Sequence, residues 1–283
     1  SLLEKVREGL TTLTALSEQT GMILIVGAPV RQSGRLFNAA VVMSHGRICG
    51  VVPKTFLPNT QEFYEERWFS SAFDLVDDQL AWLDEAPPFG TDLLFDVDGM
   101  PDCLFGVEIC EDAWVANPPS GAMAAAGATL LINLSASPEI LGKCSYRRAL
   151  VESQSARCLS AYLYASAGPG ESSTDLVFSG HSLVAEYGQI LAETERFQFT
   201  SQMAVADIDV QRLVHERLPG AAQKRGTEVT VHGADVGDAA LQRENHVLGR
   251  DARHLGLGRR ALANDADEEV GGIGLGAAGL VMM

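Results

Sequence analysis

Residues 103–114 read CLFGVEICEDAW and join an apolar run to a group of acidic residues. The run from Cys103 to Cys110 is short, apolar and rich in branched and aromatic side chains, which predicts a buried β-strand. Glu111, Asp112 and then a Pro-Pro pair at 118–119 follow, so the chain turns there. Cys110 is thereby predicted to lie at a strand-to-turn junction.

Helical and extended patterns alternate on both sides of this strand. Leucine and valine recur at three- and four-residue steps over residues 2–20, which predicts a helix that Gly21 ends. Two further helices are predicted over 119–128 and 145–159. Strands are predicted over 22–29, 37–43, 47–52, 91–97, 129–135, 161–166, 175–178, 181–187 and 189–194. Strands that alternate with helices and are interrupted by hairpins predict an α/β fold, with a mixed sheet covered by helices.

Bulk properties restrict the class of protein. The 283 residues are 46% hydrophobic, which suits one large domain and a tail, and the formal charge of −16 argues against a nucleic-acid partner. No run of 18 uncharged apolar residues occurs and the first residues lack the order of a signal peptide, so we expect no membrane partner. Five cysteines without a C-x-x-C pair fit a reducing, cytoplasmic location.

The composition changes near Arg217. Residues 200–283 contain no aromatic residue, while Gly, Ala and Asp accumulate. Aromatic side chains supply much of the area that a core buries. We therefore expect a domain over 1–217 and a linker-like or disordered tail over 218–283. The tail's GLGAAG (274–279) has no preceding strand pattern and is rejected as a dinucleotide-binding motif.

Cys110 and Lys54 are the candidate reactive pair. A nucleophile at a strand end is presented to a cleft while its backbone stays fixed. From spacing alone, a buried structural cysteine is the commoner outcome, and the neighbouring acids would raise the pKa of a thiol. Lys54 follows an apolar strand between Pro53 and Pro58. A lysine aimed at Cys110 would favour the thiolate and stabilise an oxyanion.

Other reactive arrangements find less support. The six histidines show no H-x-x-x-H spacing, so no metal site is expected, and no histidine is an evident partner for a papain-like Cys–His pair. SGHSLV lacks the second glycine of a G-x-S-x-G elbow.

Four blocks, VVPKTFLPNTQEFYEERWF (51–69), FGVEICEDAW (105–114), LLINLSASPEILGK (130–143) and GPGESSTDLVFSG (168–180), resemble the nitrilase-type glutaminase (carbon-nitrogen hydrolase) domain of glutamine-dependent NAD⁺ synthetases. The blocks occur in the family order, and the resemblance covers about residues 2–217. It implies a four-layer α-β-β-α sandwich of the nitrilase superfamily and a Cys–Lys–Glu triad. Cys110 matches the nucleophile, Lys54 the oxyanion-stabilising cation and Glu65 a second carboxylate near that lysine. A charged loop residue is the alternative for Glu65.

The resemblance also implies a glutamine pocket. Glu111 would support the substrate, Trp114 would form a wall of the pocket, and Ser137 and Lys143 match positions that hold the α-amino and α-carboxylate groups. Thr60 stands where relatives often have a tyrosine that contacts glutamine, which weakens that part of the assignment.

Two parts of the family pattern are not found in these residues. The general-base glutamate lies on a strand before the first helix in the family, and this sequence begins at that helix; the sandwich is therefore expected to be truncated at its N-terminus and the fragment inactive. The synthetase domain, which would use ATP and Mg²⁺, is also not present, and no cofactor is expected within this chain.

The implied function is hydrolysis of the glutamine amide, which supplies ammonia for ATP-dependent NAD⁺ synthesis from nicotinic-acid adenine dinucleotide. Glutamine is the implied substrate, a synthetase domain the ammonia acceptor, and a homo-oligomer the implied assembly. Two alternatives stay open: a free-standing nitrilase-superfamily amidase that acts on another small amide, and a non-catalytic interaction remnant.

Overall fold

The computed structural model describes residues 1–60, 63–82, 86–171, 176–224, 232–235 and 279–282. The chain opens with α1 (Leu2–Thr20), whose first turn is held by a capping box between Ser1 and Glu4 and whose end is set by Gly21 at φ 67°. Within the described residues, no helix is both long and apolar enough to cross a lipid bilayer.

Two β-sheets form the middle of the molecule. In the described residues the first sheet has the order β11-β1-β2-β3 and the second has the order β10-β4-β5-β6-β7-β8-β9. The first sheet contains β1 (Ile23–Gln32), β2 (Arg35–Ser44), β3 (Arg47–Pro53) and β11 (Gly279–Met282). The second contains β4 (Leu93–Asp96), β5 (Leu104–Ile109), β6 (Leu130–Ser135), β7 (Ala161–Ser166), β8 (Leu183–Glu186), β9 (Gln189–Glu193) and β10 (His232–Asp235).

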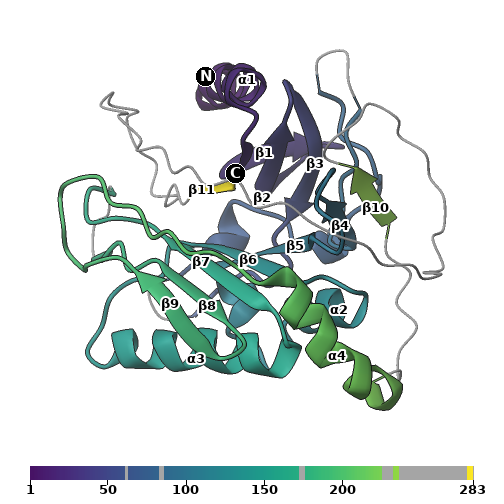
Figure 1. Cartoon of the computed structure of the whole chain (residues 1–283). Coiled ribbons are helices and arrows are strands. Elements are labelled where there is room, and N and C mark those ends of the chain that lie inside the picture. The colour runs from purple at the N-terminus through teal and green to yellow at the C-terminus, as the bar shows by residue number, and fades with distance from the viewer. Residues whose placement is uncertain (61–62, 83–85, 172–175, 225–231, 236–278, 283) are drawn as a thin grey trace.

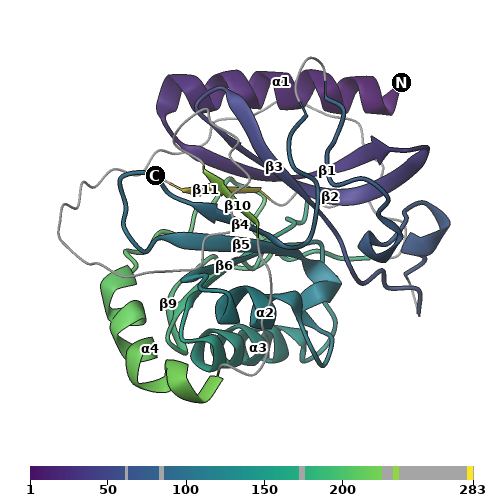
Figure 2. The same ribbon diagram turned by 90° about the vertical axis from the view of Figure 1, so that its right-hand side faces the viewer.

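The layers follow the order helix, sheet, sheet, helix (Figure 2). The helix α1 covers the outer face of the first sheet, while α2 (Pro119–Ala125) and α3 (Lys143–Cys158) cover the outer face of the second. A last helix, α4 (Val210–Lys224), lies near α2 and α3 (Figure 1). The predicted four-layer α-β-β-α sandwich is thus confirmed.

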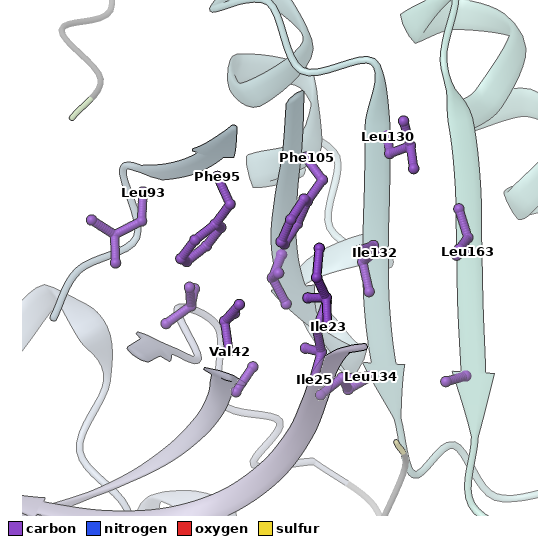
Figure 3. Close-up of a cluster of buried hydrophobic side chains, with 14 of the residues drawn as sticks. Ile23, Ile25, Val42, Leu93, Phe95, Phe105, Leu130, Ile132, Leu134 and Leu163 are labelled. Carbon is purple, nitrogen blue, oxygen red and sulfur yellow. The ribbon is translucent and has the colours of Figure 1, made fainter. Parts of the chain in front are cut away.

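Apolar side chains from both sheets meet between them (Figure 3). The Phe95 and Phe105 rings stack with centroids 4.9 Å apart, next to Ile23 and Val42 of the first sheet. The strands β5, β6 and β7 run parallel, and helices cover their other face. Because they are buried on both faces, these strands read in the sequence as nearly continuous apolar runs, broken by Glu108 in β5 and Asn133 in β6.

The strand predicted over 175–178 is wrong for its described part: Leu176, Val177 and Phe178 form no ladder. The predicted domain limit at Arg217 falls inside α4, which continues to Lys224, and two four-residue strands, β10 and β11, lie beyond it. The rest of the predicted tail, including most of GLGAAG, lies outside the described residues, so its linker-like character stays a prediction.

Candidate active site

Cys110 lies where β5 ends and the short 3₁₀ turn η3 (Cys110–Ala113) begins. Its φ is 47°, in the left-handed region that non-glycine residues seldom adopt. The side chain is nearly buried, at 8% exposure. Such backbone strain persists where the surrounding structure holds the residue in place, and it often accompanies functional positions.

The backbone of Cys110 is fixed by Asn133, a fully buried residue of β6. The Cys110 N–H donates to Oδ1 of Asn133 at 3.2 Å, and Nδ2 of Asn133 donates to the Cys110 carbonyl at 3.4 Å. Asn133 is not among the residues that the sequence predicted for the site. Its signal was available as a lone amide inside the apolar run LLINLS, because a buried polar side chain needs hydrogen-bond partners.

Lys54 follows β3 and is almost fully buried, at 2% exposure. Its Nζ atom lies 2.5 Å from Oε2 of Glu65, and Oε1 of Glu65 accepts a hydrogen bond from Nδ2 of Asn38 at 2.9 Å. Burial is the largest influence on the pKa of Lys54 and lowers it; the electrostatic interactions with Cys110 and Glu65 oppose burial, and the net pKa lies above its ordinary value. The structure therefore keeps a charged lysine close to the Cys110 thiol.

The acidic residues beside Cys110 have separate partners. Glu108 accepts hydrogen bonds from the Tyr162 hydroxyl and, at 2.8 Å, from the Ser120 N–H, and burial raises its pKa. Glu111 is half-buried; burial raises its pKa, while Lys54 and then Lys143 act in the opposite direction. Glu111 is thus the acidic neighbour that shares the electrostatic environment of both lysines.

Trp114 and Lys143 lie together beside the 3₁₀ turn. The Lys143 ammonium is 4.7 Å from the centroid of the Trp114 ring, and Tyr146 packs edge-on against the same ring at 5.2 Å. Ser137 is buried in the loop after β6, next to the Tyr164 hydroxyl. Burial raises the pKa of Tyr164 to about 12, and Cys110 contributes to the rise. Tyr164 thus connects the Ser137 loop with the nucleophile position.

Thr60 is the only one of the predicted pocket residues that is exposed. It is exposed in the loop after β3, and its carbonyl accepts a hydrogen bond from the Phe63 N–H at 3.0 Å. Within the described residues, no hydrogen bond joins Thr60 to Cys110 or Lys54. The structure therefore brings together the predicted nucleophile, lysine and second carboxylate, and places Glu111, Trp114, Ser137 and Lys143 around them, but leaves Thr60 apart.

A cysteine–histidine contact exists elsewhere in the fold. Sγ of Cys144 lies 3.8 Å from Nδ1 of His181, although no histidine stood out in the sequence as a cysteine partner. Across the part of the chain that the structure describes, no group of three residues forms a metal-binding cluster.

The profile of the carbon-nitrogen hydrolase family matches residues 6–216. The chain belongs to this family. It is 46% identical over 219 residues to the glutamine-dependent NAD(+) synthetase of Mycobacterium tuberculosis, in an alignment that covers 77% of this chain and 32% of that protein. The chain thus spans about a third of the length of this curated relative.

Solved structures agree with this assignment. The glutamine-dependent NAD(+) synthetase of Cytophaga hutchinsonii matches with a TM-score of 0.58 at 27% identity, over 69% of this chain and 31% of that chain. The carbon-nitrogen hydrolase of Helicobacter pylori G27 shares the fold, with a TM-score of 0.61 at 21% identity over 79% and 75% of the two chains. The resemblance predicted from the sequence blocks is confirmed.

Proposed function

We propose that this chain hydrolyses the side-chain amide of glutamine and supplies the ammonia to an ATP-dependent NAD⁺ synthetase domain. The observation that carries the proposal is the buried, charged Lys54, held by Glu65 within electrostatic reach of a strained Cys110. A thiol beside a fixed cation suits attack on an amide carbon, because the cation stabilises both the thiolate and the oxyanion.

In the proposed reaction, a carboxylate outside residues 1–283 takes the thiol proton and Sγ of Cys110 bonds to the amide carbon. The carbonyl oxygen becomes an oxyanion beside Lys54. Since Asn133 accepts the N–H of Cys110, we assign the backbone donor for the oxyanion to the next residue, Glu111. The proton passes to the leaving nitrogen, ammonia departs, and water then cleaves the thioester to release glutamate and restore the thiol.

The assignment of the general base to another segment has a structural basis. Among the described residues, the Cys110 thiol forms no hydrogen bond to a carboxylate, and the nearby Glu65 is paired with Lys54 and Asn38. General-base loss typically costs about 10²–10⁴-fold in rate. We therefore expect residues 1–283 alone to release ammonia far more slowly than a chain that includes the preceding segment.

Lys143, Ser137 and Trp114 are proposed to hold the amino-acid end of glutamine. Lys143 would meet the α-carboxylate as a point charge, because an ammonium cannot form the bidentate fork of arginine. Trp114, against which the Lys143 ammonium rests, would form the adjoining wall. The names of the relatives support NAD⁺ synthesis as the destination of the ammonia, with ATP and Mg²⁺ bound by the synthetase domain; a homo-oligomeric assembly is proposed with it.

The test is ammonia release from glutamine by the chain with its preceding segment. Cys110→Ala and Lys54→Met should each lower the rate by about 10³-fold or more. When catalytic residues act as a unit, the removal of one of them already removes most of the activity. The matched control is Cys103→Ala, which changes a buried core cysteine directly before β5 and should retain the rate. Hydrolysis of other small amides in preference to glutamine would instead identify a free-standing amidase, and no amide hydrolysis at all would identify a non-catalytic remnant.

A further inference from the structure

Asp112 binds backbone groups from two separate segments. Its carboxylate is buried, at 1% exposure. Oδ1 accepts the N–H of Phe56 at 2.8 Å and that of Thr55 at 3.2 Å. Oδ2 accepts the N–H of Ile109 at 3.0 Å.

These donors adjoin the two reactive side chains. Thr55 and Phe56 directly follow Lys54, at the exit of β3 in the first sheet. Ile109 directly precedes Cys110, at the exit of β5 in the second sheet. Apolar contacts between the sheets set their separation but have no direction, whereas hydrogen bonds to a carboxylate oxygen do.

We propose that Asp112 is a positioning residue that holds the Lys54 segment of one sheet in a fixed place relative to the Cys110 segment of the other. The inference rests on the proposed pairing of Lys54 with Cys110 and adds the residue that maintains it. Asp112 binds the backbone of both segments, and the proposal assigns its effect on reactivity to the place of Lys54 relative to Cys110.

A purely electrostatic role for Asp112 predicts the opposite result from a positioning role. Burial raises the pKa of Asp112 to about 7, so the carboxylate is charged above that pH; removing this charge close to Cys110 favours the thiolate and should make the thiol more reactive there. Releasing the Lys54 segment removes a positive charge from the thiol and should make it less reactive. The sign of the change therefore separates the two roles.

The experiment measures carbamidomethylation of Cys110 by iodoacetamide in the chain that contains residues 1–283, followed peptide by peptide with mass spectrometry across pH 6 to 9.5 (roughly the range of thiol titration). In this reaction the thiolate sulfur bonds to the reagent's CH₂ carbon and iodide leaves, so neither glutamine nor the general base is needed. The variants are Asp112→Asn, Asp112→Ala, Lys54→Met and the double variant. Asp98→Asn, at an exposed turn, is the matched control.

We expect Asp112→Ala to slow Cys110 labelling about 10-fold or more near pH 7.5 and to move its pH profile to higher pH, with a smaller effect for Asp112→Asn, which keeps one acceptor oxygen. In the Lys54→Met background, Asp112→Ala should change the rate by no more than about 2-fold, because effects that act through one group are not additive. Asp98→Asn should label like the unaltered chain.

Faster labelling of Asp112→Asn, or independent effects of the two substitutions, would overturn the proposal. If Asp112→Ala fails to fold, as judged by circular dichroism, the near-isosteric Asp112→Asn separates the two roles. Slower labelling of Cys110 supports the positioning role, and faster labelling supports the electrostatic role. Lys54→Met that labels at the unaltered rate would remove Lys54 from the proposed reaction itself. If Cys110 labelling is slower in Lys54→Met but unchanged in the Asp112 variants, only the role of Asp112 is overturned.

Discussion

Sγ of Cys144 lies 3.8 Å from Nδ1 of His181, but that ring nitrogen also lies 3.2 Å from NH1 of Arg147. Arg147 is fully buried and can only donate, so Nδ1 of His181 is the acceptor. The other ring nitrogen, Nε2, faces Oε2 of Glu193 at 3.2 Å. His181 therefore has its basic lone pair directed to Arg147, and Cys144 gains no general base from this contact.

Cys110 should accordingly be the cysteine that an electrophilic glutamine analogue labels, in a chain extended before Ser1 by the strand that the family resemblance implies. Cys110→Ala should abolish labelling and Cys144→Ala should leave it unchanged, as read by intact mass and peptide mapping. Cys144 is the informative comparison because it adjoins Lys143, which we place in the pocket. Labelling that survives Cys110→Ala and disappears in Cys144→Ala would reverse the assignment.

His181 should make the stability of the fold depend on pH. Burial is the largest influence on its pKa and lowers it, and Arg147 acts in the same direction against Glu193. The folded chain thus binds this proton less tightly than the unfolded chain, so stability should fall as pH drops below the unfolded value of about 6.5. Protonated Nδ1 would also point an N–H at the Arg147 guanidinium.

The measurement is the free energy of unfolding in urea at pH 7.5 and pH 5.5 (roughly one unit on either side of the histidine pKa). The loss between these values should be smaller in His181→Gln than in the unaltered chain. His215→Gln, an exposed histidine on α4, is the control and should keep the full loss. Equal pH dependence in all three proteins would contradict the prediction.

Glu65 should matter for stability because it is the anion paired with a buried lysine. Glu65→Gln leaves the Lys54 charge buried without a full counter-charge, and we expect a loss of about 1–3 kcal/mol in the free energy of unfolding, less than for a fully buried pair because Glu65 is 19% exposed. Glu66→Gln alters the adjacent, exposed carboxylate and should cost less than about 0.5 kcal/mol. Similar losses for both variants would show that the pair adds no stability.

The sequence predicted the elements well because their signals are local. The helix over 2–20 has apolar periodicity and Gly21 as its end, and it is observed with these limits. The strand at 103–110 has an apolar run broken only by Glu108, and it is observed one residue shorter at each end. The predicted strand at 175–178 failed because an apolar run also suits a loop that packs on the domain: Phe178 is buried without a ladder.

The site was predictable only in part. Their positions at strand ends made Cys110 and Lys54 candidates, and the resemblance assigned their roles and added Glu65. The backbone contacts of Asp112 and Asn133, however, join segments distant in sequence. Such contacts depend on how two sheets stack, which no local pattern encodes. The sequence placed Asp112 only as an acidic neighbour of Cys110, whereas the structure directs its carboxylate to backbone N–H groups.

The segment beyond α4 should be dispensable for folding of the sandwich. The sequence after Lys224 has no aromatic residue, and ordering each residue costs about 1–2 kcal/mol of backbone entropy. Its two described strands are four residues each, at the sheet edges. Limited proteolysis should leave a core that ends near Lys224, and truncation there should lower Tm by less than about 4 °C, the equivalent of about 1 kcal/mol. A larger drop would show that the segment packs on the domain.

Arg217, by contrast, should hold α4 on the sandwich. Its Nε donates to the carbonyl of Leu159 at 2.9 Å and its NH1 to that of Gly127 at 3.1 Å. Its NH2 donates to the carbonyls of Ala128 at 2.6 Å and Cys158 at 3.0 Å. These carbonyls lie at or just beyond the C-terminal ends of α2 and α3, where carbonyl groups lack partners within the helix and the helix dipole is negative.

Arg217→Ala should therefore lower the free energy of unfolding by about 2–4 kcal/mol, because it removes a charged donor from four carbonyls, of which water can satisfy some. The free energy of unfolding of Arg217→Lys should lie between those of the unaltered chain and Arg217→Ala. An ammonium keeps the charge but cannot reach all four acceptors as the planar guanidinium does. Arg212→Ala, an exposed arginine on the same helix that lies 3.8 Å from Glu186, is the control and should cost less than about 1 kcal/mol.

Urea unfolding of the four proteins at one pH gives the comparison. If Arg217→Lys matches the unaltered chain, the charge alone suffices and the fork geometry is irrelevant; if Arg217→Ala matches Arg212→Ala, α4 is held by its buried Leu213 instead.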